Sequence, residues 1–161
     1  ECSNGNGSLM RILPLAFTEA SPSDIEAVSS ITHAHATSVE ACLLYVAIAR
    51  RLLRGQQLSE ILSDLETSPT YARLQTLAEL TEDDIRSSGY VVDTLEAALW
   101  CLLTSTSYPE TVLKAVNLGD DTDTVAAVAG GLAGIIYGLD EIPDNWLAQL
   151  RNKELLESCL F

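Results

Sequence analysis

The stretch VDTLEAALWCLLT, at residues 92–104, decides the fold together with TDTVAAVAGGLAGIIY at residues 122–137. Both stretches are rich in Ala and Leu, and both are long for a strand, so they favour helix. They are the least charged helical stretches of the chain. In the second, Gly130 and Ala133 would let a neighbouring helix approach closely. We therefore expect an all-α protein in which these two helices pack against each other at its centre.

The other helices are predicted from apolar spacing and from residues that start or stop a helix. Ser21 followed by Pro22 is a typical helix start, and Gly55 is a typical stop for the strongest amphipathic segment, residues 37–54. We expect one domain over residues 1–161 with about eight helices. The remaining predicted segments are 9–13 (ending at Pro14), 21–31, 58–65, 70–80, 109–118, 143–150 and 152–160, with a loop at 81–89.

The charge of the chain excludes several classes of partner. Its net charge is −14, from 23 acidic and 9 basic residues. The basic residues form no cluster, so neither a nucleic-acid backbone nor an anionic membrane surface is expected as a partner. A small phosphate-bearing ligand remains compatible with this charge, provided that a metal ion and a few backbone amides hold it locally.

The four cysteines, Cys2, Cys42, Cys101 and Cys159, are widely separated and have no metal-binding spacing. Cys42 and Cys101 lie in apolar helical segments, where a reduced thiol behaves as a small core residue. No stretch reaches the length of a membrane span or resembles a secretory leader, so we expect a cytoplasmic protein.

The sequence GDDTDT at residues 119–124 is the sharpest candidate for a functional site. Its carboxylates and hydroxyls are hard oxygen ligands of the kind that Mg²⁺ or Mn²⁺ prefers, and Gly119 permits a tight turn. Helix capping is an equally good explanation from composition alone, because Asp and Thr are common at helix starts.

Two known metal motifs share these letters, and neither fits. An EF-hand loop starting at Asp121 needs Gly and Glu where the chain has Ala126 and Leu132. The DxDx[TV] motif of haloacid-dehalogenase-type phosphatases matches residues 121–125, but it belongs at the end of a strand. Residues 114–118 are instead predicted to end a helix.

Three further segments are candidates for ligand contact. NGNGS at residues 4–8 is either an ordinary turn or a nest of backbone N–H groups that binds phosphate. His33 and His35 lie close together without a third soft ligand, so they are more typical of a polar helix end or loop than of a zinc site. Donation by a histidine to a phosphate or ribose is the intermediate interpretation. Tyr90 follows Gly89 and is able to stack on a base, whereas Trp100 is expected in the core.

These segments, in this order, resemble the ADP-ribosylglycohydrolase family, which includes the dinitrogenase reductase-activating glycohydrolase. The resemblance covers almost the whole chain and is strongest over its last 75 or so residues. The motifs that carry it are NGSLMR at residues 6–11, THAH at 32–35, SGYVVDTLEAALW at 88–100, residues 117–124, GGLAG at 130–134 and IPDNWL at 142–147.

The resemblance implies an all-helical fold with two Mg²⁺ or Mn²⁺ ions in a central cleft. It implies that Asp121, Asp123 and Thr124 are metal ligands. The residues that it implies in contact with an ADP-ribose-containing substrate are Asn6, Gly7, Ser8, His33 and Tyr90. The family motif often has a second Gly where this chain has Asp120.

One family feature is not found in these 161 residues. Family members carry a Glu and a second metal motif upstream of NGS, so the catalytic acid is expected upstream of this chain. The first residues are Glu1 and Cys2 rather than Met, and the chain is therefore interpreted as a piece of a longer protein, with an N-terminal segment of that protein as its partner.

The expected activity is metal-dependent hydrolysis of the N- or O-glycosidic bond of ADP-ribosylated protein or a related compound. The metal ions would orient a water toward the anomeric carbon, and a carboxylate would move the proton. Two alternatives stay open: a non-catalytic ADP-ribose-binding or crystallin-like structural member of the family, and a metal-dependent phosphatase, which requires a strand before residue 119.

Overall fold

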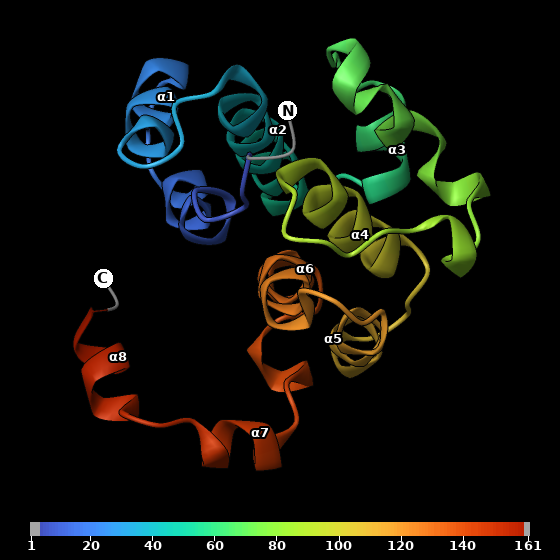
Figure 1. The fold of residues 1–161 in the computed structure, drawn as a ribbon. Helices are drawn as coiled ribbons and strands as arrows, with labels where there is room; N and C mark the ends of the chain where they lie inside the picture. The colour runs from blue at the N-terminus through green and yellow to red at the C-terminus, as the bar shows by residue number, and fades with distance from the viewer. Residues whose placement is uncertain (1–3, 160–161) are drawn as a thin grey trace.

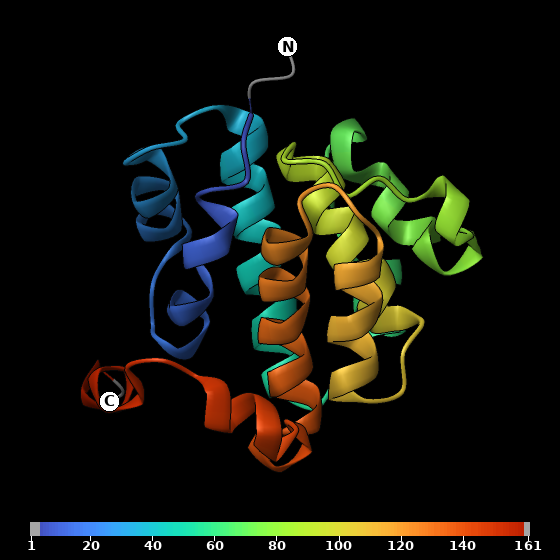
Figure 2. The ribbon, with the colours of Figure 1, turned by 60° about the horizontal axis from the view of Figure 1, so that its bottom comes forward.

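Helix α4 (Val91–Leu103) lies at the centre of the molecule, and eleven of its thirteen residues are buried. A helix that is apolar on nearly every side is stable only where other elements surround it. Helices α2 (Ala36–Leu53), α5 (Tyr108–Asn117) and α6 (Thr122–Tyr137) pack around it, as Figures 1 and 2 show. The predicted packing of the two apolar helices, α4 and α6, is confirmed.

The computed structural model describes residues 4–159, and within them the fold is all-α, with eight α-helices and no strand. The number of helices agrees with the prediction. The other α-helices are α1 (Pro22–Ser30), α3 (Leu58–Ser63), α7 (Asp144–Gln149) and α8 (Lys153–Cys159), and the 3₁₀ helices are η1 (Leu9–Arg11), η2 (Leu13–Phe17), η3 (Pro69–Glu79), η4 (Glu82–Asp84) and η5 (Leu139–Glu141).

Glycines on α6 allow close packing, as predicted, but toward other neighbours than α4. A Cβ at Gly131 would lie 2.6 Å from Leu13 Cδ2 and 3.0 Å from the Tyr45 hydroxyl oxygen. A Cβ at Gly130 would lie 3.4 Å from atoms of Tyr108 and Val112 on α5. The two glycines therefore let η2, α2 and α5 approach the backbone of α6.

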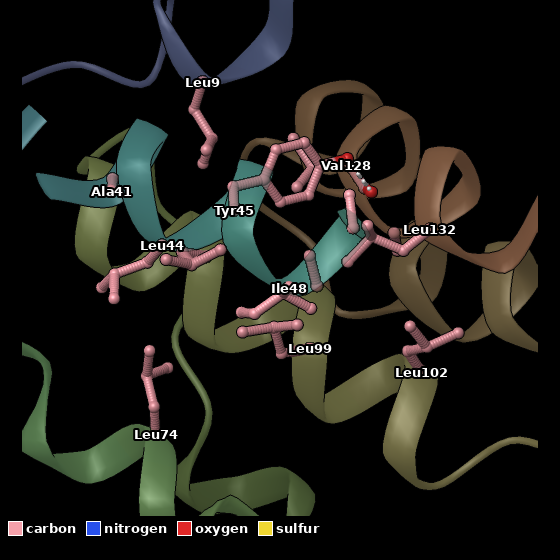
Figure 3. Packing of buried hydrophobic residues seen from close by; sticks show 14 of the residues in the cluster. Leu9, Ala41, Leu44, Tyr45, Ile48, Leu74, Leu99, Leu102, Val128 and Leu132 are labelled. Carbon is pink, nitrogen blue, oxygen red and sulfur yellow. Dashed lines mark hydrogen bonds between the residues drawn. The ribbon is translucent and has the colours of Figure 1, made fainter. Parts of the chain in front are cut away.

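Tyr45 connects α2 to α6 at the centre of the core (Figure 3). Its ring is buried among Leu9, Ile48 and other apolar side chains, and its hydroxyl donates to the Val128 carbonyl over 2.8 Å. Burial raises the pKa of Tyr45 far above its ordinary value. The buried phenol is therefore neutral and satisfied by a partner, as a buried polar group must be.

Two predicted helices differ in type from the expectation. Residues 70–80 form the 3₁₀ helix η3, because Tyr71, Leu74 and Leu77 face the core at three-residue spacing, the repeat of a 3₁₀ helix. The run at 9–13 does not end at Pro14. It continues into η2, where Pro14 occupies a first-turn position that needs no N–H donor. The predicted loop at 81–89 contains the short helix η4.

Cys42 and Cys101 are buried free thiols, as predicted, and burial raises the pKa of Cys101 to about 12. Cys159 is exposed, and Cys2 lies outside the described residues. Among the helices of residues 4–159, none combines the length and apolarity that crossing a bilayer requires.

Candidate functional site

The first described residues of the chain lie against the start of α4. Gly5 and Tyr90 form an isolated antiparallel bridge, and the Val91 amide donates to the Asn4 carbonyl over 2.9 Å. The loop at residues 4–8 is thereby fixed at the end of the bundle where α4 and α6 begin, the upper end in Figure 2. Two segments that the sequence predicted to share a site are adjacent.

Asn6 joins this loop to both central helices. Its side chain is 9% exposed, and its Nδ2 donates to Thr94 Oγ1 on α4 over 2.8 Å and to Asp121 Oδ2 over 2.6 Å. Thr94 is fully buried, and its hydroxyl lies within hydrogen-bond distance of the carbonyl oxygens of Ser88 and Tyr90. The amide of Asn6 is therefore held by α4 while it contacts Asp121.

The turn before α6 has the backbone that the sequence predicted. Gly119 has φ +90° and Asp120 has φ +52°, both in the left-handed region. Glycine adopts this region freely, and Asp tolerates it better than most residues, which accounts for Asp at position 120. Two hydrogen bonds hold the turn against Ser87. The Asp121 amide donates to the Ser87 carbonyl, and Ser87 Oγ donates to the Gly119 carbonyl.

Asp121 occupies the N-cap position of α6, but its side chain accepts no hydrogen bond from the first amides of the helix. Its two carboxylate oxygens accept instead from Asn6 Nδ2 and, over 2.9 Å, from Thr124 Oγ1. Helix capping, the alternative to a functional role, therefore does not describe this side chain.

Asp123 is exposed in the first turn of α6, and within residues 4–159 its carboxylate has no hydrogen-bond or ion-pair partner. Those residues contain no cluster of three His, Cys, Asp or Glu side chains suited to a metal ion. Asp121, Asp123 and Thr124 thus supply the oxygen donors that Mg²⁺ or Mn²⁺ prefers, but fewer of them than a six-coordinate ion requires.

His33 lies over the glycines of the loop. A Cβ at Gly7 would lie 2.9 Å from His33 Cε1, and one at Gly5 would lie 3.3 Å from Nε2. Glycine at both positions therefore makes room for the imidazole ring. Arg11 also contacts the loop, since its Nη1 donates to the Gly7 carbonyl over 2.9 Å.

Ser8 and Tyr90 have different surroundings from the other predicted ligand contacts. The Ser8 side chain is fully buried and accepts from the Cys42 thiol, with Oγ and Sγ 3.5 Å apart. Tyr90 is half-buried at the N-cap of α4 and packs against the core. The structure therefore brings Asn6, Gly7, His33, Asp121 and Thr124 to one side of the bundle end, while the Ser8 hydroxyl points into the interior.

Sequence reasoning missed several residues that support this arrangement: Thr32, Ser87, Ser88 and Thr94. Ser88 Oγ donates to Asp93 Oδ2 over 2.6 Å, which fixes the loop before α4. A hydroxyl residue within an otherwise apolar helix, such as Thr94, was the available signal.

Glu96 is buried on another side of α4. It forms an ion pair with Arg73 at 3.5 Å, between Arg73 Nη1 and Glu96 Oε2. Burial raises the pKa of Glu96, with a further contribution from the charge of Asp93, while Arg73 opposes the shift.

A groove with a volume of about 510 Å³ lies away from these residues. It is formed at the C-terminal ends of α2, α4 and α6, and its lining includes Leu52, Leu102, Ser105 and Ile135. It carries no Asp, Glu, Lys, Arg or His side chain, so the candidate site is located from the chemistry of its residues.

Comparisons with known proteins give a consistent result. A sequence model of the family described as ADP-ribosylglycohydrolase matches residues 1–160. ADP-ribosylarginine hydrolase Tri1 of Pseudomonas putida (strain GB-1) is 40% identical over 155 residues, which cover 91% of this chain and 42% of that protein. ADP-ribosyl-[dinitrogen reductase] glycohydrolase of Rhodospirillum rubrum is 34% identical over 154 residues, which cover 92% and 51%.

A solved structure described as an ADP-ribosylglycohydrolase-related protein complex has the same fold. It superposes with a TM-score of 0.80 at 34% identity, covering 96% of this chain and 58% of that one. The chain thus spans about half the length of the curated relatives that it matches.

Proposed function

The chain belongs to the ADP-ribosylglycohydrolase family, and from this premise we propose that it supplies one part of a metal-dependent hydrolase site. The proposed reaction is cleavage of the glycosidic bond between ADP-ribose and a modified protein side chain. Arginine is the favoured linkage, because a relative 40% identical to the chain is named an ADP-ribosylarginine hydrolase. Other ADP-ribosylated compounds are the remaining substrates to test.

The observation that carries the proposal is the contact between Asn6 and Asp121, which are 115 residues apart in sequence. Thr124 donates to the other oxygen of the same carboxylate. A loop suited to binding phosphate and a turn rich in metal ligands therefore meet at one point.

The donor set agrees chemically with a hard divalent cation. Asp121, Asp123 and Thr124 would hold it through carboxylate and hydroxyl oxygens, which Mg²⁺ and Mn²⁺ accept. When bound, such ions polarise ribose oxygens and lower the pKa of a coordinated water. The role of Asn6 in this proposal is to hold the Asp121 carboxylate in a fixed orientation from one side.

The substrate would lie over the loop at residues 4–8. Gly5 and Gly7 make room for the His33 ring beside this loop, and Tyr90 adjoins the loop at the start of α4. The chain is strongly acidic as a whole, so binding of the two phosphates depends on these local groups and not on long-range attraction. The acidic surroundings suit the reaction itself, because the transition state develops positive charge at the ribose.

The test is an NMR titration of the 161-residue chain with Mn²⁺, a paramagnetic ion that broadens signals close to it. The amide signals of Asp121, Asp123 and Thr124 are expected to broaden first, and excess Mg²⁺ should restore them. Asp121→Asn should abolish this pattern, whereas the matched control Asp140→Asn, an exposed acid in η5, should preserve it. Broadening that is unchanged in D121N would contradict the metal site.

ADP-ribose is then added to the Mg²⁺-loaded chain. Shifts at Asn6, Gly7, His33 and Tyr90 are expected, and their absence at millimolar ligand would contradict the substrate site.

A non-catalytic ADP-ribose-binding or structural role is the second candidate. It is favoured by the small number of metal-binding side chains within residues 4–159. Binding of ADP-ribose without hydrolysis of any ADP-ribosylated peptide by the full-length protein would support it. A phosphatase is not supported, because residues 108–117 form the helix α5 where that activity needs a strand.

A further inference from the structure

Arg11, the last residue of η1, joins the loop at residues 4–8 to the connection between α1 and α2. Besides the Gly7 carbonyl, its guanidinium contacts the Thr32 hydroxyl oxygen, with Nη2 and Oγ1 2.5 Å apart, and the Val28 carbonyl over 3.3 Å. A guanidinium stays protonated and only donates hydrogen bonds. The Thr32 oxygen is therefore an acceptor in its contact with Arg11.

The Thr32 hydroxyl also lies beside His33, with Oγ1 and Nδ1 2.7 Å apart. The hydroxyl has one hydrogen and two acceptor lone pairs. Because the cationic Arg11 already donates to the oxygen, the oxygen is a weaker acceptor for a second donor and its hydrogen is a stronger donor to Nδ1. A neutral imidazole whose Nδ1 accepts carries its own hydrogen on Nε2. The contacts thus favour one of the two tautomers of His33.

Two further features hold His33 in place: hydrogen bonds of its backbone to Ser29, and the glycines that face its ring. The His33 amide donates to the Ser29 carbonyl over 2.9 Å, and the fully buried Ser29 hydroxyl donates to the His33 carbonyl over 3.1 Å. The Cε1–Nε2 edge of the ring faces Gly5 and Gly7 and occupies the space that a side chain at either position would fill. The hydrogen on Nε2 is therefore held at the loop that is proposed to bind ADP-ribose.

We propose that Arg11 and Thr32 are positioning residues that keep His33 as an Nε2–H donor at the loop. His33 then donates to an acceptor oxygen of the ligand, a phosphate or ribose oxygen of ADP-ribose. The identity of this ligand rests on the proposed function, whereas the tautomer does not. A role for Arg11 and Thr32 in protein stability alone would leave the tautomer unchanged when they are replaced.

The tautomer is measured on the ¹⁵N-labelled chain from the long-range ¹H–¹⁵N correlations of its imidazole rings, at a pH about 1.5 units above the ordinary histidine pKa of about 6.5. The chain has two histidines. His35 is an internal control, because its Nδ1 accepts from the Thr37 amide over 3.2 Å independently of Thr32. Wild type should give Nε2–H for His33, and an Nδ1–H pattern would overturn the proposal.

Three variants then test the positioning. Thr32→Val and Arg11→Met should each convert His33 into a mixture of tautomers, while Thr32→Ser keeps Nε2–H and His35 stays unchanged in all three. An Nε2–H pattern that persists in both T32V and R11M would show that neither residue positions the ring.

The consequence for the ligand is measured by calorimetry with ADP-ribose and Mg²⁺. Loss of one correctly oriented hydrogen bond should weaken binding by T32V about 3- to 10-fold. T32S and the control Thr76→Val, an exposed threonine in η3, should bind as wild type does. Equal affinity of T32V and wild type would contradict donation by His33. Wild-type protein that has the Nε2–H tautomer but does not bind ADP-ribose would contradict the proposed function and leave the positioning by Arg11 and Thr32 established.

Discussion

At the residue scale, the side chain of Asn6 combines structural and functional roles. It is nearly buried, and both of its recorded partners, Thr94 and Asp121, lie on other elements. Removing one partner of a buried hydrogen bond leaves the other unsatisfied, which costs more than the bond itself contributes. Asn6 should therefore influence stability as well as the orientation of the Asp121 carboxylate.

Asn6→Ala is expected to lower the free energy of unfolding by about 1–3 kcal/mol, because it leaves Thr94 and Asp121 without their shared donor. The matched control is Asn117→Ala, which removes a single exposed hydrogen bond to the Leu113 carbonyl and should change stability by less than about 0.5 kcal/mol. Urea unfolding followed by circular dichroism measures both. Equal effects of the two substitutions would show that Asn6 contributes no more than a surface residue.

The raised pKa of Glu96 predicts a pH-dependent effect of Glu96→Gln. A group whose pKa is raised in the folded state stabilises the fold while protonated and loses that contribution as the pH rises through the folded-state value. Gln resembles the protonated form, so the stability of E96Q relative to wild type should rise as the pH rises above the ordinary Glu pKa of about 4.3. Urea midpoints across this range measure the change.

Glu110→Gln should behave in the opposite way and serves as the control. Hydrogen bonds from the Thr106 amide and hydroxyl lower the pKa of Glu110, so its contribution is fully present above the ordinary carboxyl pKa and is lost as the pH falls through the lowered folded-state value. The stability of E110Q relative to wild type should therefore fall as the pH rises to the ordinary Glu pKa of about 4.3, and should stay constant at higher pH. The same slope for both variants would contradict the assigned causes.

From the sequence, the main segments of the candidate site could be predicted, but the residues that hydrogen-bond to them could not. The loop at 4–8, His33 and the turn at 119–124 could be found because they match, in order, segments of one family, although each alone has an ordinary structural explanation. Thr94 and Thr32 could not, because a single hydroxyl has meaning only through the atom it contacts, and Thr94 is 88 residues from Asn6.

At the scale of elements, the residues that begin a helix could be predicted from local sequence, whereas the type of helix, α or 3₁₀, could not. Ser21 forms the predicted cap of α1, with its hydroxyl accepting from the Asp24 amide and Asp24 accepting from the Ser21 amide. Apolar periodicity located both α4 and η3. The difference between α and 3₁₀ geometry at η3 depends on a strict three-residue spacing that is easily read as one side of an α-helix.

Gly131 and Gly134 give a matched test of packing on α6. A Cβ at Gly134 would meet open space, so Gly134→Ala should stabilise the protein by about 0.5–1 kcal/mol through helix propensity. Gly131→Ala gains the same propensity but pushes against Leu13 and the hydrogen-bonded Tyr45 hydroxyl, at a cost of about 1–3 kcal/mol. Thermal unfolding should therefore place G131A below G134A. The reverse order would show that Leu13 moves aside freely.

At the scale of the whole molecule, the chain is a helical unit with its candidate site at one end of the bundle. Helices α7 and α8 extend beyond that bundle, and neither has a buried residue (Figure 2). The relatives that it matches are about twice as long. The activity of the site is therefore expected to depend on more side chains than residues 4–159 contain.

The isolated chain is predicted to hydrolyse an ADP-ribosylated arginine peptide poorly. Asp121, Asp123 and Thr124 would leave most coordination positions of an octahedral ion to water. Without the catalytic acid that the resemblance places upstream, the reaction rate should fall by a further factor on the order of 10²–10⁴. The assay compares the chain, with Mg²⁺, against the P. putida relative. A rate within about tenfold of that relative would show that this chain supplies its own proton carrier, and Asp93 and Glu96 would be examined first. Glu1 is a further candidate, outside the described residues.

The contact between Asn6 and Asp121 also constrains how the protein acquires its site. Closing a loop of 115 residues carries an entropy cost that short-range helix formation does not offset. We therefore expect the two residues to meet late in folding, because contacts of such long range slow folding. During synthesis, Asn6 emerges long before its carboxylate partner exists. We therefore expect a partly folded chain to contain helices before its candidate site has assembled.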